Sequence, residues 1–102
     1  MPYALSDLMQ LILSEEGDAL HLHEGEPPVV EIGGQLHRVE GPPLEPDEAR
    51  DMFQGIAPPE ESREIVNNGL ASFEFRHKNG VFRLMALREE GSIRLELRVV
   101  SQ

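Results

Sequence analysis

The last third of the chain, from Leu70 to Val100, alternates apolar and polar residues in three runs separated by two short turn signals. The signals are Asn79-Gly80 and Glu90-Gly91, and Asn-Gly favours a hairpin because both central residues of a type I′ turn take positive φ. Three antiparallel strands joined by tight turns constrain the fold more than any other feature of the sequence. The alternation then assigns every side chain in this segment to one of two faces of a sheet.

One face of this predicted meander is apolar and should face the core. A two-residue loop at Glu90-Gly91 pairs Arg83 with Arg98 and Leu84 with Leu97. The apolar face comprises Phe73, Phe75, Phe82, Leu84, Ala86, Ile93, Leu95, Leu97 and Val99.

The opposite face carries a predicted row of arginines. A two-residue first loop pairs Arg76 with Arg83, so that Arg76, Arg83 and Arg98 lie side by side. Directly opposed like charges destabilise a sheet by up to roughly 1 kcal/mol, so the row needs nearby anions. Either Glu74 and Glu96 on the same face supply them, or an anionic partner surface or phosphate does.

Apolar side chains among these arginines suit an interface better than a fully solvated face. The predicted partner-binding residues are Arg76, Arg83, Met85, Leu87, Arg94 and Arg98.

The rest of the chain supplies further strands and the helices. Apolar spacing and turn signals predict, in order, a helix over 7–16, strands over 19–23, 29–32 and 35–39, a helix that Pro46 opens, and a short helix over 59–66. The order α-β-β-β-α-α-β-β-β predicts a single α+β domain over residues 1–102. We expect an antiparallel sheet of about six strands with helices packed on one face.

The predicted hairpin at Gly33-Gly34 has no cleanly apolar face. A two-residue loop places Val30 opposite His37 and Leu36 opposite Glu31. A β-bulge in this hairpin therefore stays open as an alternative register.

Charge is divided unequally along the chain, whose net charge is −10. Residues 1–69 hold 15 acidic against 3 basic side chains, whereas residues 70–102 hold 4 against 6. The overall charge argues against nucleic-acid binding, which requires Lys and Arg to neutralise phosphates. The division favours docking between complementary faces, either of copies of this chain or of this chain and another protein.

The sequence has no apolar run long enough to span a membrane, no signal-peptide pattern and no cysteine. We therefore expect a cytoplasmic protein without membrane insertion. His21 and His23, two residues apart on a predicted strand, are weak metal candidates. A structural site normally needs four ligands, and no further ligand spacing exists, so we predict no metal and no cofactor. No nucleophile stands beside a base and no phosphate-binding loop is present, so no enzyme activity is expected.

A series of short segments resembles one known family. They are Leu8-Met9-Gln10-Leu11; Leu20-His21-Leu22 followed by Gly25-Glu26-Pro27-Pro28; Ile32-Gly33-Gly34-Gln35-Leu36; Gly41-Pro42-Pro43-Leu44 with Pro46-Asp47-Glu48-Ala49; and Phe82-Arg83 through Gly91 to Leu97-Arg98-Val99. Together they resemble the N-terminal domain of PilT-type secretion and twitching-motility ATPases, over about Leu5 to Val100.

The resemblance implies a PAS-like sheet domain that, in the family, is joined to a RecA-like motor forming hexamers. There the sheet domain packs on the motor of a neighbouring subunit, and arginines of the final strands can approach the nucleotide. Arg83 and Arg98 occupy such positions by resemblance. Two departures are Ala19, where the family usually has Asp, and Glu89-Glu90, where it tends to have Gln-Arg.

The family's motor, with its phosphate loop, would lie beyond Gln102. The chain is thus either a piece of a longer ATPase or a free-standing relative. We expect a non-catalytic domain that docks on a PilT-type motor or another type IV pilus or motility protein. Self-association is possible, and the alternative is a PAS-like sensor holding a small ligand between sheet and helices.

Overall fold

The computed structural model describes residues 3–78 and 80–101, which form three helices and six strands. In chain order the elements are α1 (Leu5–Ser14), β1 (Ala19–Leu22), β2 (Val29–Ile32), β3 (Gln35–Arg38), α2 (Glu48–Ile56), α3 (Pro59–Asn68), β4 (Leu70–His77), β5 (Gly80–Glu89) and β6 (Ser92–Ser101). The α+β class and the predicted order of elements are confirmed.

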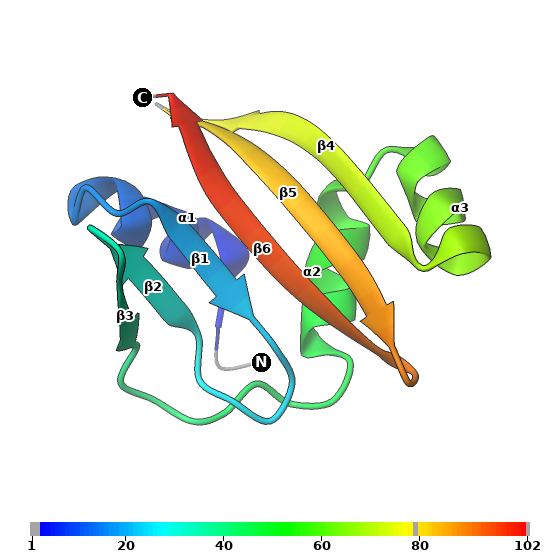
Figure 1. Ribbon diagram of the computed structural model, residues 1–102, viewed down its shortest axis with the longest axis horizontal. Coiled ribbons are helices and arrows are strands. Elements are labelled where there is room, and N and C mark those ends of the chain that lie inside the picture. The colour runs from blue at the N-terminus through cyan, green and yellow to red at the C-terminus, as the bar shows by residue number, and fades with distance from the viewer. Residues whose placement is uncertain (1–2, 79, 102) are drawn as a thin grey trace.

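All six strands join one antiparallel sheet in the order β3-β2-β1-β6-β5-β4. The first and last strands of the chain, β1 and β6, are therefore neighbours in the middle of the sheet (Figure 1). Leu20 lies opposite Leu97 in this pair, and both side chains are fully buried. The N-terminal strands β1–β3 and the predicted C-terminal meander β4–β6 are thus joined into one sheet by a contact between the chain's two halves.

Helices α1 and α2 lie behind the sheet as drawn, and no helix of residues 3–78 and 80–101 lies on the front face (Figure 1). Helix α3 lies along the edge strand β4, where the Ser72 N–H donates to Glu61 Oε1 at 3.2 Å. Helices therefore cover one face of the sheet, as predicted. None of the helices in the described part of the chain is both long and apolar enough to cross a membrane.

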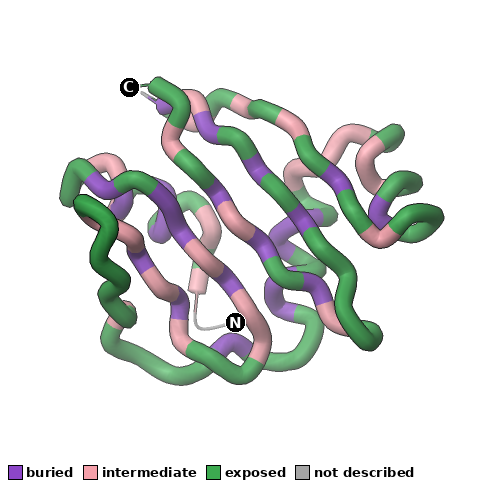
Figure 2. Tube along the Cα trace, in the orientation of Figure 1, coloured by how far each residue is buried: buried purple, intermediate pink, exposed green. Residues whose placement is uncertain are grey.

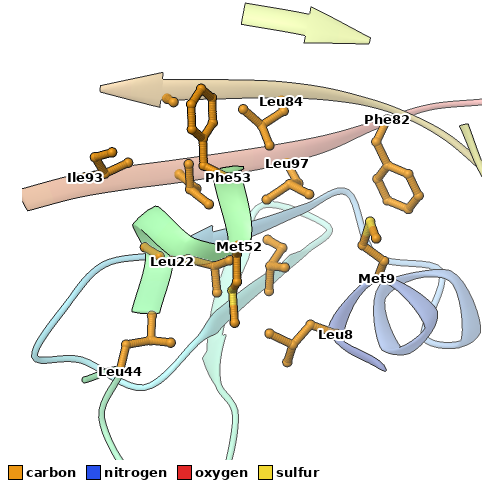
Figure 3. Packing of buried hydrophobic residues seen from close by; sticks show 14 of the residues in the cluster. Leu8, Met9, Leu22, Leu44, Met52, Phe53, Phe82, Leu84, Ile93 and Leu97 are labelled. Atoms are coloured by element: carbon orange, nitrogen blue, oxygen red, sulfur yellow. The ribbon is translucent and has the colours of Figure 1, made fainter. Parts of the chain in front are cut away.

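The core lies between the covered face and the helices. Burial alternates along β5 and β6 (Figure 2), and the predicted apolar face is confirmed: six of its residues are buried and Phe73, Phe75 and Val99 pack partly buried against them. Phe53 projects from α2 toward the sheet near Leu84 and Leu97 (Figure 3), and all three are fully buried. Each such side chain contributes about 1.5–3 kcal/mol through burial.

The first hairpin of the meander does not have the predicted register. Gly80 pairs with His77 inside the ladder, and Lys78 takes the left-handed conformation with φ of 52°. Asn79, half of the predicted turn, lies outside the described residues. The observed β4–β5 register differs from the predicted one by two residues. Every β4 side chain therefore stays on its predicted face of the sheet but lies opposite a different residue of β5.

Packing explains this register. Phe75 lies opposite Phe82, with ring centroids 5.7 Å apart in a stacked arrangement. Gly80 is buried against α1, where a Cβ would lie 3.0 Å from Leu13 Cδ2. A glycine is therefore needed at this position because β5 and α1 approach closely, and not because the backbone has a positive φ.

The other two turns agree with the sequence. Gly33-Gly34 and Glu90-Gly91 all have positive φ, which fits type I′ turns. Val30 lies opposite His37 and Glu31 opposite Leu36 in a regular ladder, so the alternative of a bulge in this hairpin is excluded.

Candidate functional site: the open face of the sheet

The helix-free side of the sheet, called here the open face, displays residues in rows that run across the strands. In one row Glu74, Arg83 and Arg98 lie directly opposite one another on β4, β5 and β6, and the row continues through Ala19 to Glu31. The pairing of Arg83 with Arg98 confirms the prediction. The row begins with the carboxylate of Glu74, because β4 contributes Glu74 and not Arg76, and it carries a second carboxylate at Glu31 before it ends at Leu36 of β3.

Arg76 was placed wrongly by the sequence argument. It lies opposite Val81, one row farther along the sheet, because Phe75 stacks on Phe82 and sets the hairpin register. The predicted row of three arginines is therefore a row of two.

Carboxylates of the same face pair with both arginines. Arg83 Nη2 donates to Glu74 Oε2, Arg98 Nε donates to Glu96 Oε2 at 3.3 Å, and Arg98 Nη2 lies 3.5 Å from Glu31 Oε1. The arginine charges are thus neutralised within the face, which was the first of the two explanations that the sequence left open. Exposed pairs of this kind contribute only about 0.2–1 kcal/mol each, so an external anion can compete with them.

Two groups of this network have shifted pKa values. A hydrogen bond from His21 holds the pKa of the Glu31 carboxyl below its ordinary value, and the Arg98 charge acts in the same direction against partial desolvation. Partial desolvation works to lower the pKa of the Arg98 guanidinium, but Glu96 and Glu31 outweigh it and raise that pKa. Both side chains are therefore firmly ionised near neutral pH.

An apolar hollow of about 180 Å³ lies beside this network. Its lining residues are Leu70, Met85, Ala86, Leu87, Arg94 and Glu96. Leu70, Met85 and Leu87 are 51%, 44% and 40% exposed, and Arg94 lies at the rim with its Nε 3.3 Å from Glu89 Oε1. Apolar side chains rimmed by arginine match the composition of interface centres.

The structure brings Arg83, Met85, Leu87, Arg94 and Arg98 together on the open face and leaves Arg76 at its margin. It adds Leu70, which the sequence argument missed. The signal was present, because Leu70 precedes Ser72 and Glu74 at the strand period of two and so shares their face.

The two metal candidates lie in hydrogen bonds with carboxylates. His21 Nε2 is 3.2 Å from Glu31 Oε1, and His23 Nδ1 is 3.2 Å from Glu26 Oε2. These four side chains contribute to the lining of an open hollow of about 400 Å³ on the sheet. Within residues 3–78 and 80–101, no three His, Cys, Asp or Glu side chains gather in a way that could hold a metal ion.

Comparison with known proteins supports the resemblance. No protein-family profile matches the chain. The type IV pilus ATPase PilU of Pseudomonas aeruginosa (strain PAO1) is 25% identical over 92 residues, which cover 89% of this chain and 24% of that protein. The chain therefore spans about a quarter of the length of this curated relative.

Solved structures show the same fold. The pilus retraction motor PilT, crystallised with bound ADP, superposes with a TM-score of 0.86 at 22% identity, over 94% of this chain and 29% of that one. The Legionella pneumophila ATPase DotB superposes with a TM-score of 0.70 at 21% identity, over 95% and 29% of the two chains. The chain thus has the fold of a part of PilT-type ATPases, consistent with the N-terminal domain that the sequence segments indicate.

Proposed function

We propose that this chain is a non-catalytic protein-interaction domain that docks through its open face on a PilT-type motor or another pilus, motility or secretion protein. The observation that carries the proposal is the hollow formed by Leu70, Met85 and Leu87, which are exposed beside Arg94 on a sheet face that no helix covers. Met and Arg are enriched in the cores of protein interfaces, and a few well-packed, desolvated residues at the centre carry most of the binding energy.

The arginines of the open face would steer the encounter and select an acidic partner surface. Arg83 and Arg98 are each about half exposed. Within the described residues Arg83 pairs with the exposed Glu74, and Arg98 pairs with the partly buried Glu31 and Glu96. Such charges mainly affect the association rate and the specificity of docking. Proximity of these two arginines to a nucleotide, as the resemblance implies, stays a prediction, and so does a cytoplasmic location.

The experiment is capture of a purified PilT-type motor by the immobilised chain. We expect Leu70→Ser with Leu87→Ser to reduce capture at least tenfold, since two apolar anchors are lost from the contact. The matched control is Val66→Ser with Leu36→Ser: these valine and leucine side chains are 67% and 66% exposed but do not line the hollow. Equal loss of capture by both pairs would contradict docking through the hollow formed by Leu70, Met85 and Leu87.

A second candidate function is a small-ligand sensor. The observation that favours it is an open groove of about 370 Å³ between α1 and the β2–β3 hairpin, with apolar lining from Leu11, Val30, Ile32 and Val39. Its volume lies within the range of small-molecule sites. Native mass spectrometry of the purified chain tests this candidate: a stoichiometric bound compound would favour it, and a bare polypeptide mass would favour docking.

A further inference from the structure

Two carboxylates on the open face are each shared between the same two basic side chains. Glu31 Oε1 lies 3.2 Å from His21 Nε2 and 3.5 Å from Arg98 Nη2. Glu96 offers Oε2 to Arg98 Nε at 3.3 Å and Oε1 to His21 Nδ1 at 3.8 Å. His21 and Arg98 therefore compete for the same anions, and these four residues form a single cluster.

The register of the sheet produces this sharing. On β1, His21 lies directly opposite Glu96 of β6, and Ala19 lies opposite both Arg98 and Glu31. Because Ala19 has only a methyl group, Arg98 can reach across β1 to Glu31. A larger side chain at this position would separate the two charges.

The imidazole ring of His21 has two ways to meet its carboxylates. A neutral ring has one N–H and one lone pair, so it donates to one carboxylate and turns a lone pair toward the other. A protonated ring donates from both nitrogens, and the formal charge of the cluster rises from −1 to zero. Protonation thus strengthens the contacts of both Glu31 and Glu96 with His21.

Few other charged groups surround His21. Arg94 of β6, with His23 and Glu26 after β1, lines the same hollow, and Arg38 of β3 lies across β2 opposite Val29. Among the described residues, only Glu31 and Glu96 lie within ion-pair distance of the His21 ring.

We propose that His21 is a positioning residue for Arg98: protonation of the His21 ring draws Glu31 and Glu96 away from the Arg98 guanidinium and makes it available to an anionic group. By linkage, an anion bound at Arg98 favours protonation of His21 to the same extent. The lowered pKa of Glu31 supports this exchange, since that carboxylate stays charged where imidazoles titrate. The release of Arg98 is a property of the isolated chain; only its use in docking rests on the proposed function.

The test is NMR of the folded chain between about pH 5 and 8, the range in which imidazoles titrate. We expect the Arg98 Cζ chemical shift to follow the titration of the His21 ring and to become flat in His21→Gln. The control His23→Gln should leave the Arg98 response intact, because His23 pairs with Glu26. Combining Glu31→Gln with Glu96→Gln should also flatten the Arg98 response while His21 still titrates.

Sulfate is the anionic probe, because its charge is constant over this range. We expect sulfate to bind at Arg98 about fivefold more tightly at the acid end, at the low end of typical coupling, and His21→Gln to abolish the difference. A flat Arg98 signal in the wild-type chain, or sulfate affinity independent of pH, would overturn the proposal. Failure to capture a motor, with the Arg98 response intact, would overturn the proposed function alone.

Discussion

Gly80 of β5 lies against Leu13 of α1, so closely that a Cβ on the glycine would be 3.0 Å from Leu13 Cδ2 and 3.1 Å from Phe82 Cε2. This contact joins the hairpin to the first helix and accompanies the register that places Glu74 beside Arg83. The register decides which charges meet on the open face.

Replacing Gly80 by Ala should destabilise the fold by about 1–3 kcal/mol, because the added methyl overpacks the contact with Leu13. Urea denaturation at neutral pH measures the change. Gly55→Ala in α2 is the matched control: nothing lies within 4 Å of the added methyl, and a helical glycine-to-alanine change should stabilise by about 0.5–1 kcal/mol. Equal stability of the two variants would contradict the close approach of β5 and α1.

Replacing Phe53 by Ala should cost about 3–5 kcal/mol, because this fully buried ring fills the space between α2 and the sheet. The midpoint of thermal unfolding should fall accordingly. Val66→Ala, at a side chain 67% exposed on α3, should change stability by less than about 0.5 kcal/mol. A mild effect at Phe53 would place the core elsewhere.

Stability should depend on the charge of Glu31 at acid pH. The pKa of Glu31 is lowered in the folded chain from its ordinary value of 4.5, mainly by the hydrogen bond with His21. A lowered folded-state pKa stabilises the fold above the ordinary value, and this contribution is lost as pH falls through the folded pKa. Glu31→Gln should therefore lower stability at neutral pH and have less effect below the folded pKa.

The measurement for Glu31 is urea denaturation at several pH values, with Glu40→Gln as control because the hydrogen bonds and ion pairs found among the described residues do not include the Glu40 side chain. A difference between wild type and Glu31→Gln that is the same at every pH would refute the role of the Glu31 charge.

Combining Arg83→Glu with Arg98→Glu should change folding stability little, since exposed ion pairs each contribute about 0.2–1 kcal/mol. Partner binding should fall sharply, and the loss of affinity should be largest at low salt. The Debye length is about 10 Å at 0.1 M and becomes longer as the salt concentration falls, so charges are then least screened. The pair Arg50→Glu with Arg63→Glu makes the same change in net charge on the helices. A double variant at Arg83 and Arg98 that unfolds but keeps residual affinity would assign these arginines to the fold.

The sequence by itself determined the elements and the two faces of the sheet. The period-two alternation of residues 70–100 and the glycines at 33–34 and 91 are local signals, and they identified the strands, two of the turns and the apolar face. The register error of two residues affects β4 alone. Met85, Leu87, Arg94 and the Arg83–Arg98 pair lie on β5 and β6, so they were correctly placed together.

Only the tertiary structure decided which charges meet. Phe75 stacks on Phe82 and Gly80 packs against Leu13, and these contacts determine the register of the first hairpin. As a result Glu74, and not Arg76, lies opposite Arg83, and the turn includes Lys78. The pairing of β1 with β6 brought His21 to Glu96, and the pairing of β1 with β2 brought Glu31 within reach of Arg98. Contacts between residues more than sixty positions apart depend on packing of the whole core, which local periodicity does not encode.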